Sequence, residues 1–307
     1  MRHQSFILSE AVLNLTSSIK SIKIKDLAEL MKLKLSALVV LTAVLGYFMG
    51  TSSPEILQVV FVILGGVLLT GGSNGFNQVW ERNQDALMKR TMNRPLPAGN
   101  LSVEAAIIWS SIVSVAGISI LWFLLNPFCG ILGVLALYSY VFLYTPLKRV
   151  NSVGVTVGAF PGAIPPMLGY VAASGSFGLE PGLLFALQFM WQFPHFWAIA
   201  WVAKSDYDNG GFKMLPFNKG KTSFTAYYIA FSAFLLILIS VLPWFFGSQG
   251  PMIGNVAGVS TLIIGIFYFL VTLRFAITKE DRYAKQVMFG SFIYLPVVQL
   301  LFVLDKI

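Results

Sequence analysis

The sequence carries little charge. Of its 307 residues, 11% are Asp, Glu, Lys or Arg and 56% are hydrophobic, whereas a soluble globular chain has roughly 25% charged residues. It has one cysteine, Cys129, which excludes an intrachain disulfide and a cysteine-ligated metal centre. The first 30 residues lack the uninterrupted apolar core and the small-residue cleavage site of a signal peptide. These absences indicate a chain whose solvent is mostly lipid.

The sequence also lacks a dense basic patch. Lys and Arg outnumber Asp and Glu by 21 to 13, but they are spread over short loops between apolar runs. We therefore expect no nucleic-acid partner, and instead contacts with membrane lipid and anionic substrates. Residues 1–30 mix charges with scattered apolar positions, which predicts a cytoplasmic tail that ends in an amphipathic segment. Residues 31–307 are expected to form a single transmembrane domain.

Long apolar runs make up most of the remaining chain. A bilayer core of ~30 Å needs about 20 apolar residues per helix, and this template fits nine runs. The expected fold is therefore an all-α, polytopic membrane helical bundle. The predicted spans are residues 33–50, 56–79, 103–125, 128–144, 153–173, 183–203, 226–246, 253–273 and 287–304. Because only Asn126 and Pro127 separate the third span from the fourth, eight spans are the alternative.

Positive charge lies almost entirely on one side of these spans. Every Lys and Arg except Lys306 lies before the first span, in the loops after spans two, four, six and eight, or at the adjoining span ends. The opposite loops, such as 51–54 and 174–178, have no basic residue. Positively charged loops stay cytoplasmic. We therefore expect a protein of the cell (inner cytoplasmic) membrane, with its N-terminus and active site on the cytoplasmic side and its C-terminus outside.

The strongest polar cluster begins at the end of the second span. Asn77, Glu81 and Asp85 recur every four residues, which places them on one helix face within roughly 80° and about 12 Å of rise. Two carboxylates and an amide suit Mg²⁺, which completes its shell with water and phosphate oxygens. Three basic residues that match phosphate follow at once, Lys89, Arg90 and Arg94. The cluster predicts a metal-diphosphate site; the alternative is a solvated loop that only fixes topology.

A second polar group surrounds the end of the sixth span. His195 lies well inside this span, where an ionisable side chain is costly and by default suggests a function. Alternatively, His195 is a neutral imidazole hydrogen-bonded to a neighbouring helix. Lys204, Asp206 and Tyr207 follow at the inner mouth, where they offer a phosphate contact, a second metal ligand and a hydroxyl, respectively.

The fourth loop and the fifth span form a third stretch of interest. Lys148, Arg149 and Asn151 are either further donors at the cytoplasmic mouth or simple topology anchors. The fifth span contains three prolines, at positions 161, 165 and 166. Prolines free backbone carbonyls, which membrane helices tolerate where the break lines a cavity or is covered by protein. A pocket wall or a kink is therefore expected in this span.

Together these stretches resemble the UbiA superfamily of intramembrane prenyltransferases, whose first motif is Asn-x-x-x-Asp-x-x-x-Asp. Asn77, Glu81 and Asp85 occupy its positions, with Glu81 in place of the usual aspartate. The usual second Asp-rich motif is absent. Four runs are similar to the branch that attaches a farnesyl group to haem: Lys-Arg-Thr-Met-Asn-Arg-Pro-Leu-Pro at 89–97, Tyr-Thr-Pro-Leu-Lys-Arg at 144–149, Gly-Ala-Ile-Pro-Pro at 162–166 and Pro-His-Phe-Trp at 194–197. The likeness extends from about residue 30 to the end.

This resemblance implies farnesyl diphosphate and haem B as substrates, haem O and pyrophosphate as products, and Mg²⁺ as cofactor. Charge stabilisation at the leaving diphosphate is the main electrostatic task. The implied catalytic residues are Asn77, Glu81 and Asp85, which hold the metal, and Asp206. The implied diphosphate-binding residues are Lys89, Arg90, Arg94, Lys148, Arg149 and Lys204. The implied haem-binding residues are His195, through the iron or a propionate, and Tyr207.

Two other functions remain alternatives. An aromatic polyprenyltransferase that acts on quinone precursors would share the diphosphate site, although the Pro-His-Phe-Trp and Tyr-Thr-Pro-Leu-Lys-Arg runs argue against it. A secondary transporter would also explain a broken fifth span and His195, but it predicts substrate sites at mid-membrane in both halves. The resemblance further implies a handover of product to a haem A synthase.

Overall fold

The structure is a computed structural model that describes residues 23–307, most of which are helical. Within this range, nine helical segments coincide with the nine predicted spans, which confirms the all-α bundle. They are α3 (Leu33–Met49), α4 (Ile56–Asp85), α5 (Val103–Ser119) with the π-helical turn η1 (Ile120–Leu125), α6 (Pro127–Tyr138) with the π-helical turn η2 (Ser139–Tyr144), α8 (Val153–Ser174), α9 (Leu179–Val202), α11 (Ser223–Phe245), α12 (Asn255–Thr278) and α13 (Asp281–Leu304).

The chain is a multi-pass membrane protein. Seven helical segments of the described chain are long and apolar enough to cross a membrane, α3 is a shorter apolar helix, and α9 has 24 residues. The polar side chains of Gln188, Gln192 and His195 lower the hydropathy of α9. The third and fourth spans are separate helices, because Asn126 accepts a hydrogen bond from the Cys129 amide at 3.0 Å and so caps α6.

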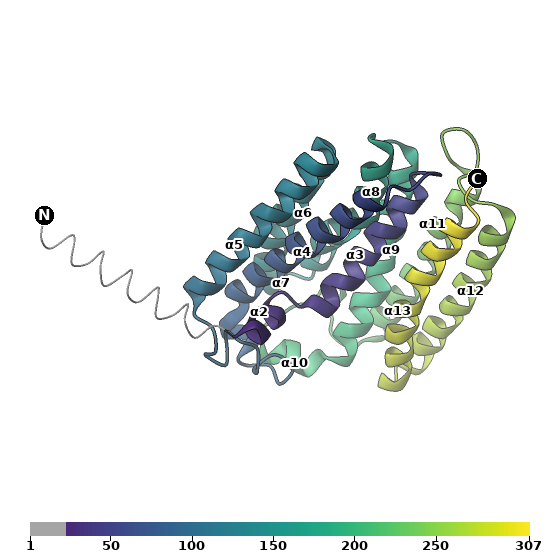
Figure 1. Cartoon of the computed structure of the whole chain (residues 1–307). Helices are drawn as coiled ribbons and strands as arrows, with labels where there is room; N and C mark the ends of the chain where they lie inside the picture. The colour runs from purple at the N-terminus through teal and green to yellow at the C-terminus, as the bar shows by residue number, and fades with distance from the viewer. Residues whose placement is uncertain (1–22) are drawn as a thin grey trace, which may run out of the picture.

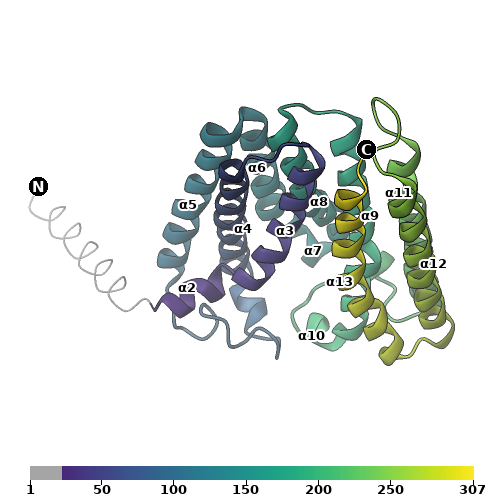
Figure 2. The ribbon, with the colours of Figure 1, turned by 45° about the vertical axis from the view of Figure 1, so that its right-hand side comes forward.

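Five helices surround a central cavity of about 310 Å³. The lining residues come mainly from α3, α4, α8, α9 and α13, and they are mostly aliphatic and aromatic. The ring closes because α3 contacts both α4 and α13, while α9 contacts both α8 and α13. α5 and α6 cover one side of this ring, and α11 and α12 cover the other (Figure 2).

Helix α8 forms a wall of the cavity without being broken by its three prolines. Pro166 has no N–H to donate to the carbonyl of Gly162. Gln188 of α9 donates to this oxygen instead, with an Nε2 to O distance of 3.1 Å. Pro161 and Pro165 line the cavity, so the pocket wall predicted at the fifth span is confirmed.

Small residues let α3 approach α8 closely. A Cβ atom at Gly169 would overlap the carbonyl oxygen of Ala43, and one at Gly46 would overlap the carbonyl oxygen of Pro166. Such small residues are typical of close contacts between membrane helices. The contact keeps α3 in the ring around the cavity.

Short helices gather at one end of the bundle, which we call the basic end. It contains α2 (Ile24–Leu30), α7 (Thr145–Val150), α10 (Lys204–Asn209), the 3₁₀ turn η3 (Pro216–Asn218) and the loop of residues 86–102. The C-terminus lies at the opposite end (Figure 1). The predicted tail and amphipathic segment at 1–30 is described only from residue 23 onward, where α2 ends it.

Candidate active site

Asn77, Glu81 and Asp85 lie on one face of the last turns of α4. The helix continues to Asp85, beyond the predicted span, because the polar turns after Val79 keep their helical hydrogen bonds. The three side chains are 2%, 3% and 0% exposed, respectively. Burial of a charged group is costly unless it is paired. The surroundings of these two carboxylates therefore decide what the site can bind.

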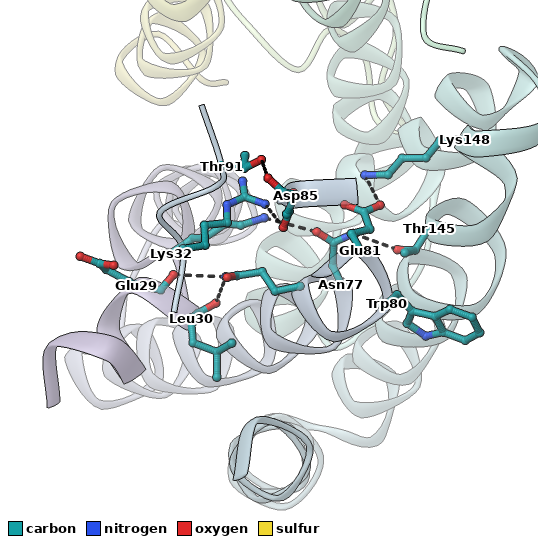
Figure 3. A network of polar contacts seen from close by, with 12 residues as sticks. Glu29, Leu30, Lys32, Asn77, Trp80, Glu81, Asp85, Thr91, Thr145 and Lys148 are labelled. Atoms are coloured by element: carbon teal, nitrogen blue, oxygen red, sulfur yellow. Dashed lines mark hydrogen bonds and ion pairs between the residues drawn. The ribbon is translucent and has the colours of Figure 1, made fainter. Parts of the chain in front are cut away.

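Each carboxylate is held by a basic side chain from another segment (Figure 3). The Nζ atom of Lys148, on α7, lies 2.6 Å from Oε1 of Glu81. The Nη1 atom of Arg94, in the loop after α4, lies 2.7 Å from Oδ2 of Asp85. The other oxygen of Asp85, Oδ1, is buried and has no hydrogen-bond partner among the described residues. The lone pairs of this Asp85 oxygen are thus available to a further ligand.

A chain of hydrogen bonds fixes the orientation of the Asn77 amide. The hydroxyl of Thr145 donates to the carbonyl of Tyr140 at 2.8 Å, across the π-helical turn η2. The Nδ2 atom of Asn77 donates to the same hydroxyl oxygen at 3.2 Å. Because the amide nitrogen is engaged there, the amide oxygen faces the carboxylates. An oxygen in that position is the atom that a hard cation needs.

Lys32 also belongs to the cluster, although no local pattern in the sequence pointed to it. Its Nζ atom donates to Oδ1 of Asn77 at 3.3 Å. The side chain reaches this position because Asn74 and Gln78 of α4 donate to backbone carbonyls of the α2–α3 turn, at 3.3 and 2.7 Å. Desolvation, together with the charge of Arg94, lowers the pKa of Lys32 to about 7.

Asp206 and Tyr207 of α10 contact the loop after α4, beside the cluster. The backbone N–H of Arg90 donates to Oδ2 of Asp206 at 3.3 Å. The guanidinium of Arg90 lies over the Tyr207 ring, 5.6 Å from its centroid. These contacts bring the two predicted polar clusters together at the basic end. None of them joins Asp206 directly to the carboxylates of α4.

Three other predicted phosphate donors lie apart from the carboxylates. Lys204 pairs with Asp208 at 2.6 Å within α10. Arg149 donates from Nη2 to the carbonyl of Trp80 at 2.5 Å. Lys89 is exposed. The structure therefore brings Arg94 and Lys148 to the buried cluster, whereas Lys89, Arg149 and Lys204 form no ion pair with its carboxylates in the described part of the chain.

The cluster adjoins the apolar cavity. Asn74, one turn before Asn77, lines the cavity, and so do Tyr140 and Tyr144 of η2. The Nζ atom of Lys148 lies 4.9 Å from the centroid of the Tyr144 ring. An amphiphilic molecule could thus place a charged head at the cluster and an apolar tail in the cavity.

His195 is buried at 5% exposure and lines the cavity rather than the charged cluster. Its imidazole stacks on the Trp191 ring, with centroids 4.5 Å apart and planes 16° apart. Its Nδ1 atom lies 2.7 Å from the hydroxyl oxygen of Ser291 on α13. Ser291 is a second residue that the sequence did not single out, because nothing in its local pattern points to a histidine 96 positions away.

The matching sequences establish the family. The UbiA prenyltransferase family matches residues 39–294. Curated relatives named protoheme IX farnesyltransferase include those of Christiangramia forsetii, 44% identical over 92% of this chain and 94% of the relative, and Cytophaga hutchinsonii, 42% identical over 91% and 96%. The relative from Flavobacterium psychrophilum is 39% identical over 96% and 99%. The chain belongs to the UbiA prenyltransferase family.

Solved structures share the fold at low sequence identity. A digeranylgeranylglyceryl phosphate synthase matches with a TM-score of 0.75 at 18% identity, over 92% of this chain and 98% of that chain. A UbiA homologue from Archaeoglobus fulgidus, solved with GPP and Mg²⁺, matches with a TM-score of 0.63 at 13% identity, over 91% and 99%. These likenesses show that the bundle shares its fold with solved UbiA homologues over about nine tenths of the chain.

Proposed function

We propose that this protein transfers a farnesyl group from farnesyl diphosphate to a vinyl group of haem B, which yields haem O and pyrophosphate. The observation that carries the proposal is the junction between a buried cluster of two carboxylates and an amide and a cavity lined mostly by apolar residues. The relatives at 39–44% identity are named for this reaction. Their family membership also disfavours the secondary-transporter alternative.

The cluster fits Mg²⁺. Among residues 23–307, no three His, Cys, Asp or Glu side chains are grouped to hold a metal ion, but Mg²⁺ needs only one or two carboxylates when phosphate and water supply the other oxygens. Asn77, Glu81 and Asp85 supply this set, and Oδ1 of Asp85 is buried without a partner. When bound, Mg²⁺ would neutralise charge on the departing diphosphate. The relative from Archaeoglobus fulgidus was solved with this ion and a prenyl diphosphate.

Three basic side chains would exchange their present protein partners for the diphosphate. Lys32, Arg94 and Lys148 each contact one of the proposed metal ligands. A cation at those ligands would release the three basic groups, which would then face the phosphate oxygens. The added negative charge favours the charged form of Lys32, whose pKa is otherwise lowered by burial. Further contacts to the diphosphate or its metal would come from residues around the cluster: Lys89, Arg90, Arg149, Lys204 and Asp206.

The cavity would hold the farnesyl chain and the porphyrin. No Asp, Glu, Lys or Arg is among the residues that line it, so an allylic cation formed there meets vinyl carbon rather than a carboxylate. His195 would contact the haem from α9, and Tyr207 would contact it at the basic end. Water completes the hydroxyethyl-farnesyl product.

We further propose that the protein lies in the inner cytoplasmic membrane, with the basic end in the cytoplasm, the C-terminus outside and haem O passed to a haem A synthase. The one-sided distribution of Lys and Arg supports the orientation.

A paired substrate assay tests the reaction. The purified protein receives Mg²⁺, farnesyl diphosphate and either haem B or 4-hydroxybenzoate, and the products are separated by chromatography and identified by mass. We expect haem O and no prenylated phenol. Prenylation of 4-hydroxybenzoate without conversion of haem would contradict the proposal and favour the aromatic polyprenyltransferase alternative.

A further inference from the structure

The hydrogen bonds around Ser291 determine which nitrogen of His195 carries the proton. The hydroxyl of Ser291 donates its only proton to the carbonyl of Met288, at 2.5 Å. The two lone pairs of its oxygen can then only accept hydrogen bonds. His195 Nδ1, 2.7 Å from the same oxygen, must therefore be a donor. The proton of the neutral imidazole resides on Nδ1.

The other nitrogen, Nε2, then presents a lone pair. It makes no hydrogen bond with the rest of the described chain, and His195 lines the cavity. The ring cannot turn freely, because it is stacked on Trp191 and meets the Phe292 ring edge-on, 4.7 Å between centroids and at 81°. Trp191 is itself anchored, since its indole N–H donates to the carbonyl of Ser291 at 2.8 Å.

We propose that Nε2 of His195 is the axial ligand of the haem iron, and that Ser291 is a positioning residue that fixes the tautomer and the ring plane. The inference rests on the proposed function, because it needs haem as the substrate. Neutral histidines that bind metals usually donate their second N–H to an acceptor, which is the role of Ser291 here. A propionate, by contrast, requires a donor, and in this tautomer Nε2 has no proton to donate.

Iron-free protoporphyrin IX separates iron ligation from a propionate contact, because it keeps both propionates and lacks the metal. The test measures binding of haem B and of protoporphyrin IX to wild type and to His195→Ala. We expect the variant to bind haem B at least about 10-fold more weakly, because removal of the ligand costs no less than removal of its outer partner, and to bind protoporphyrin IX within about twofold of wild type. Added imidazole should restore the iron–imidazole stretching band in the resonance Raman spectrum, and the retained binding of protoporphyrin IX shows that the variant is folded.

Ser291→Ala tests the positioning role. We expect its haem B affinity to fall about tenfold and its iron–imidazole stretching frequency to shift, because Nδ1 loses its acceptor. Ser232→Ala is the matched control. Ser232 is also buried and donates to the carbonyl three residues earlier, at 2.7 Å to Ile229, but it has no histidine beside it. This control should leave both the affinity and the band unchanged.

Two results would overturn the inference while leaving the reaction intact. One is an equal loss of haem B and protoporphyrin IX binding in His195→Ala, without rescue by imidazole. The other is an unchanged stretching band in Ser291→Ala. If wild type binds no haem B and converts none, the proposed function itself is wrong, and this outcome is distinct from the other two.

Discussion

The charged cluster at the basic end and the adjoining cavity stabilise their buried polar side chains in different ways. In the cluster, Glu81 and Asp85 are compensated by Lys148 and Arg94, which are full charges from other segments. In the cavity, polar side chains are compensated by neutral partners, as Gln188 is by the carbonyl of Gly162. Charge pairs can be exchanged for an ion and a diphosphate, whereas neutral hydrogen bonds keep a wall in place.

Both regions use the same hydrogen-bond arrangement to orient a functional side chain. A hydroxyl donates to a helix carbonyl and thereby becomes an acceptor for a functional side chain: Thr145 acts in this way on Asn77, and Ser291 on His195. In each case the functional atom that remains, an amide oxygen or an imidazole nitrogen, presents lone pairs to the site. In both regions a hydroxyl on a neighbouring helix fixes the orientation of the functional side chain, whereas charged side chains are concentrated in only one region.

Removal of one carboxylate should have the largest effect. In Asp85→Asn we expect the rate of haem O formation to fall at least about 100-fold, because a neutral amide cannot replace the charge that faces the metal. Thermal unfolding in detergent should show that the protein is still folded. Full activity of this variant, with Mg²⁺ still required, would remove Asp85 from the metal site.

Loss of a compensating charge should destabilise the protein. Lys148→Met leaves Glu81 buried without its partner, which costs roughly 3 kcal/mol; the two side chains are 12% and 4% exposed. Denaturant unfolding in detergent measures this difference. Lys25→Met is the control, since Lys25 and Glu29 lie 3.9 Å apart on the surface and such pairs contribute little. Equal stability of the two variants would show that the ion pair between Lys148 and Glu81 does not stabilise the fold.

The hydroxyl behind Asn77 should affect metal binding more than folding. In Thr145→Val we expect the Mg²⁺ concentration for half-maximal activity to rise about 10–100-fold, with the rate recovered at high Mg²⁺. Thr261→Val is the control, because Thr261 is equally buried and its hydroxyl has no partner among residues 23–307. An unchanged metal requirement in Thr145→Val would separate this hydroxyl from the site.

The smallest loss of stability is expected at the neutral hydrogen bonds of the cavity wall. Gln188→Leu removes the donor to the Gly162 carbonyl and should cost about 1 kcal/mol of stability. Pro166→Ala restores a backbone N–H that can donate to the same oxygen. In a double-mutant cycle, Gln188→Leu should therefore cost less in the Pro166→Ala background than in wild type. Additive costs would mean that Gln188 does not replace the missing helical bond.

Local patterns predicted the parts of the molecule that depend on local geometry. The four-residue spacing of Asn77, Glu81 and Asp85 was enough to place them on one face of α4, and apolar run lengths were enough for the helices. The partner of each carboxylate depends on how α7 and the loop after α4 fold back, which no local pattern contains. Lys32 entered the site for the same reason.

Lys204 shows the opposite case. Its position at the inner mouth predicted a phosphate donor, yet Asp208 is four residues away, a spacing at which opposite charges pair on a helix. The structure shows this pair at 2.6 Å. This local partner was visible in the sequence, and it makes Lys204 a weaker candidate for a phosphate donor than Arg94 or Lys148.

The most direct measurement follows haem binding and haem conversion in the same samples, with and without Mg²⁺. If the cavity holds the porphyrin and the cluster holds the metal-bound diphosphate, wild type with EDTA should bind haem B fully but form no haem O, and added Mg²⁺ should start conversion without changing haem affinity. Haem O formed at the full rate in EDTA would contradict this division of tasks between the two regions.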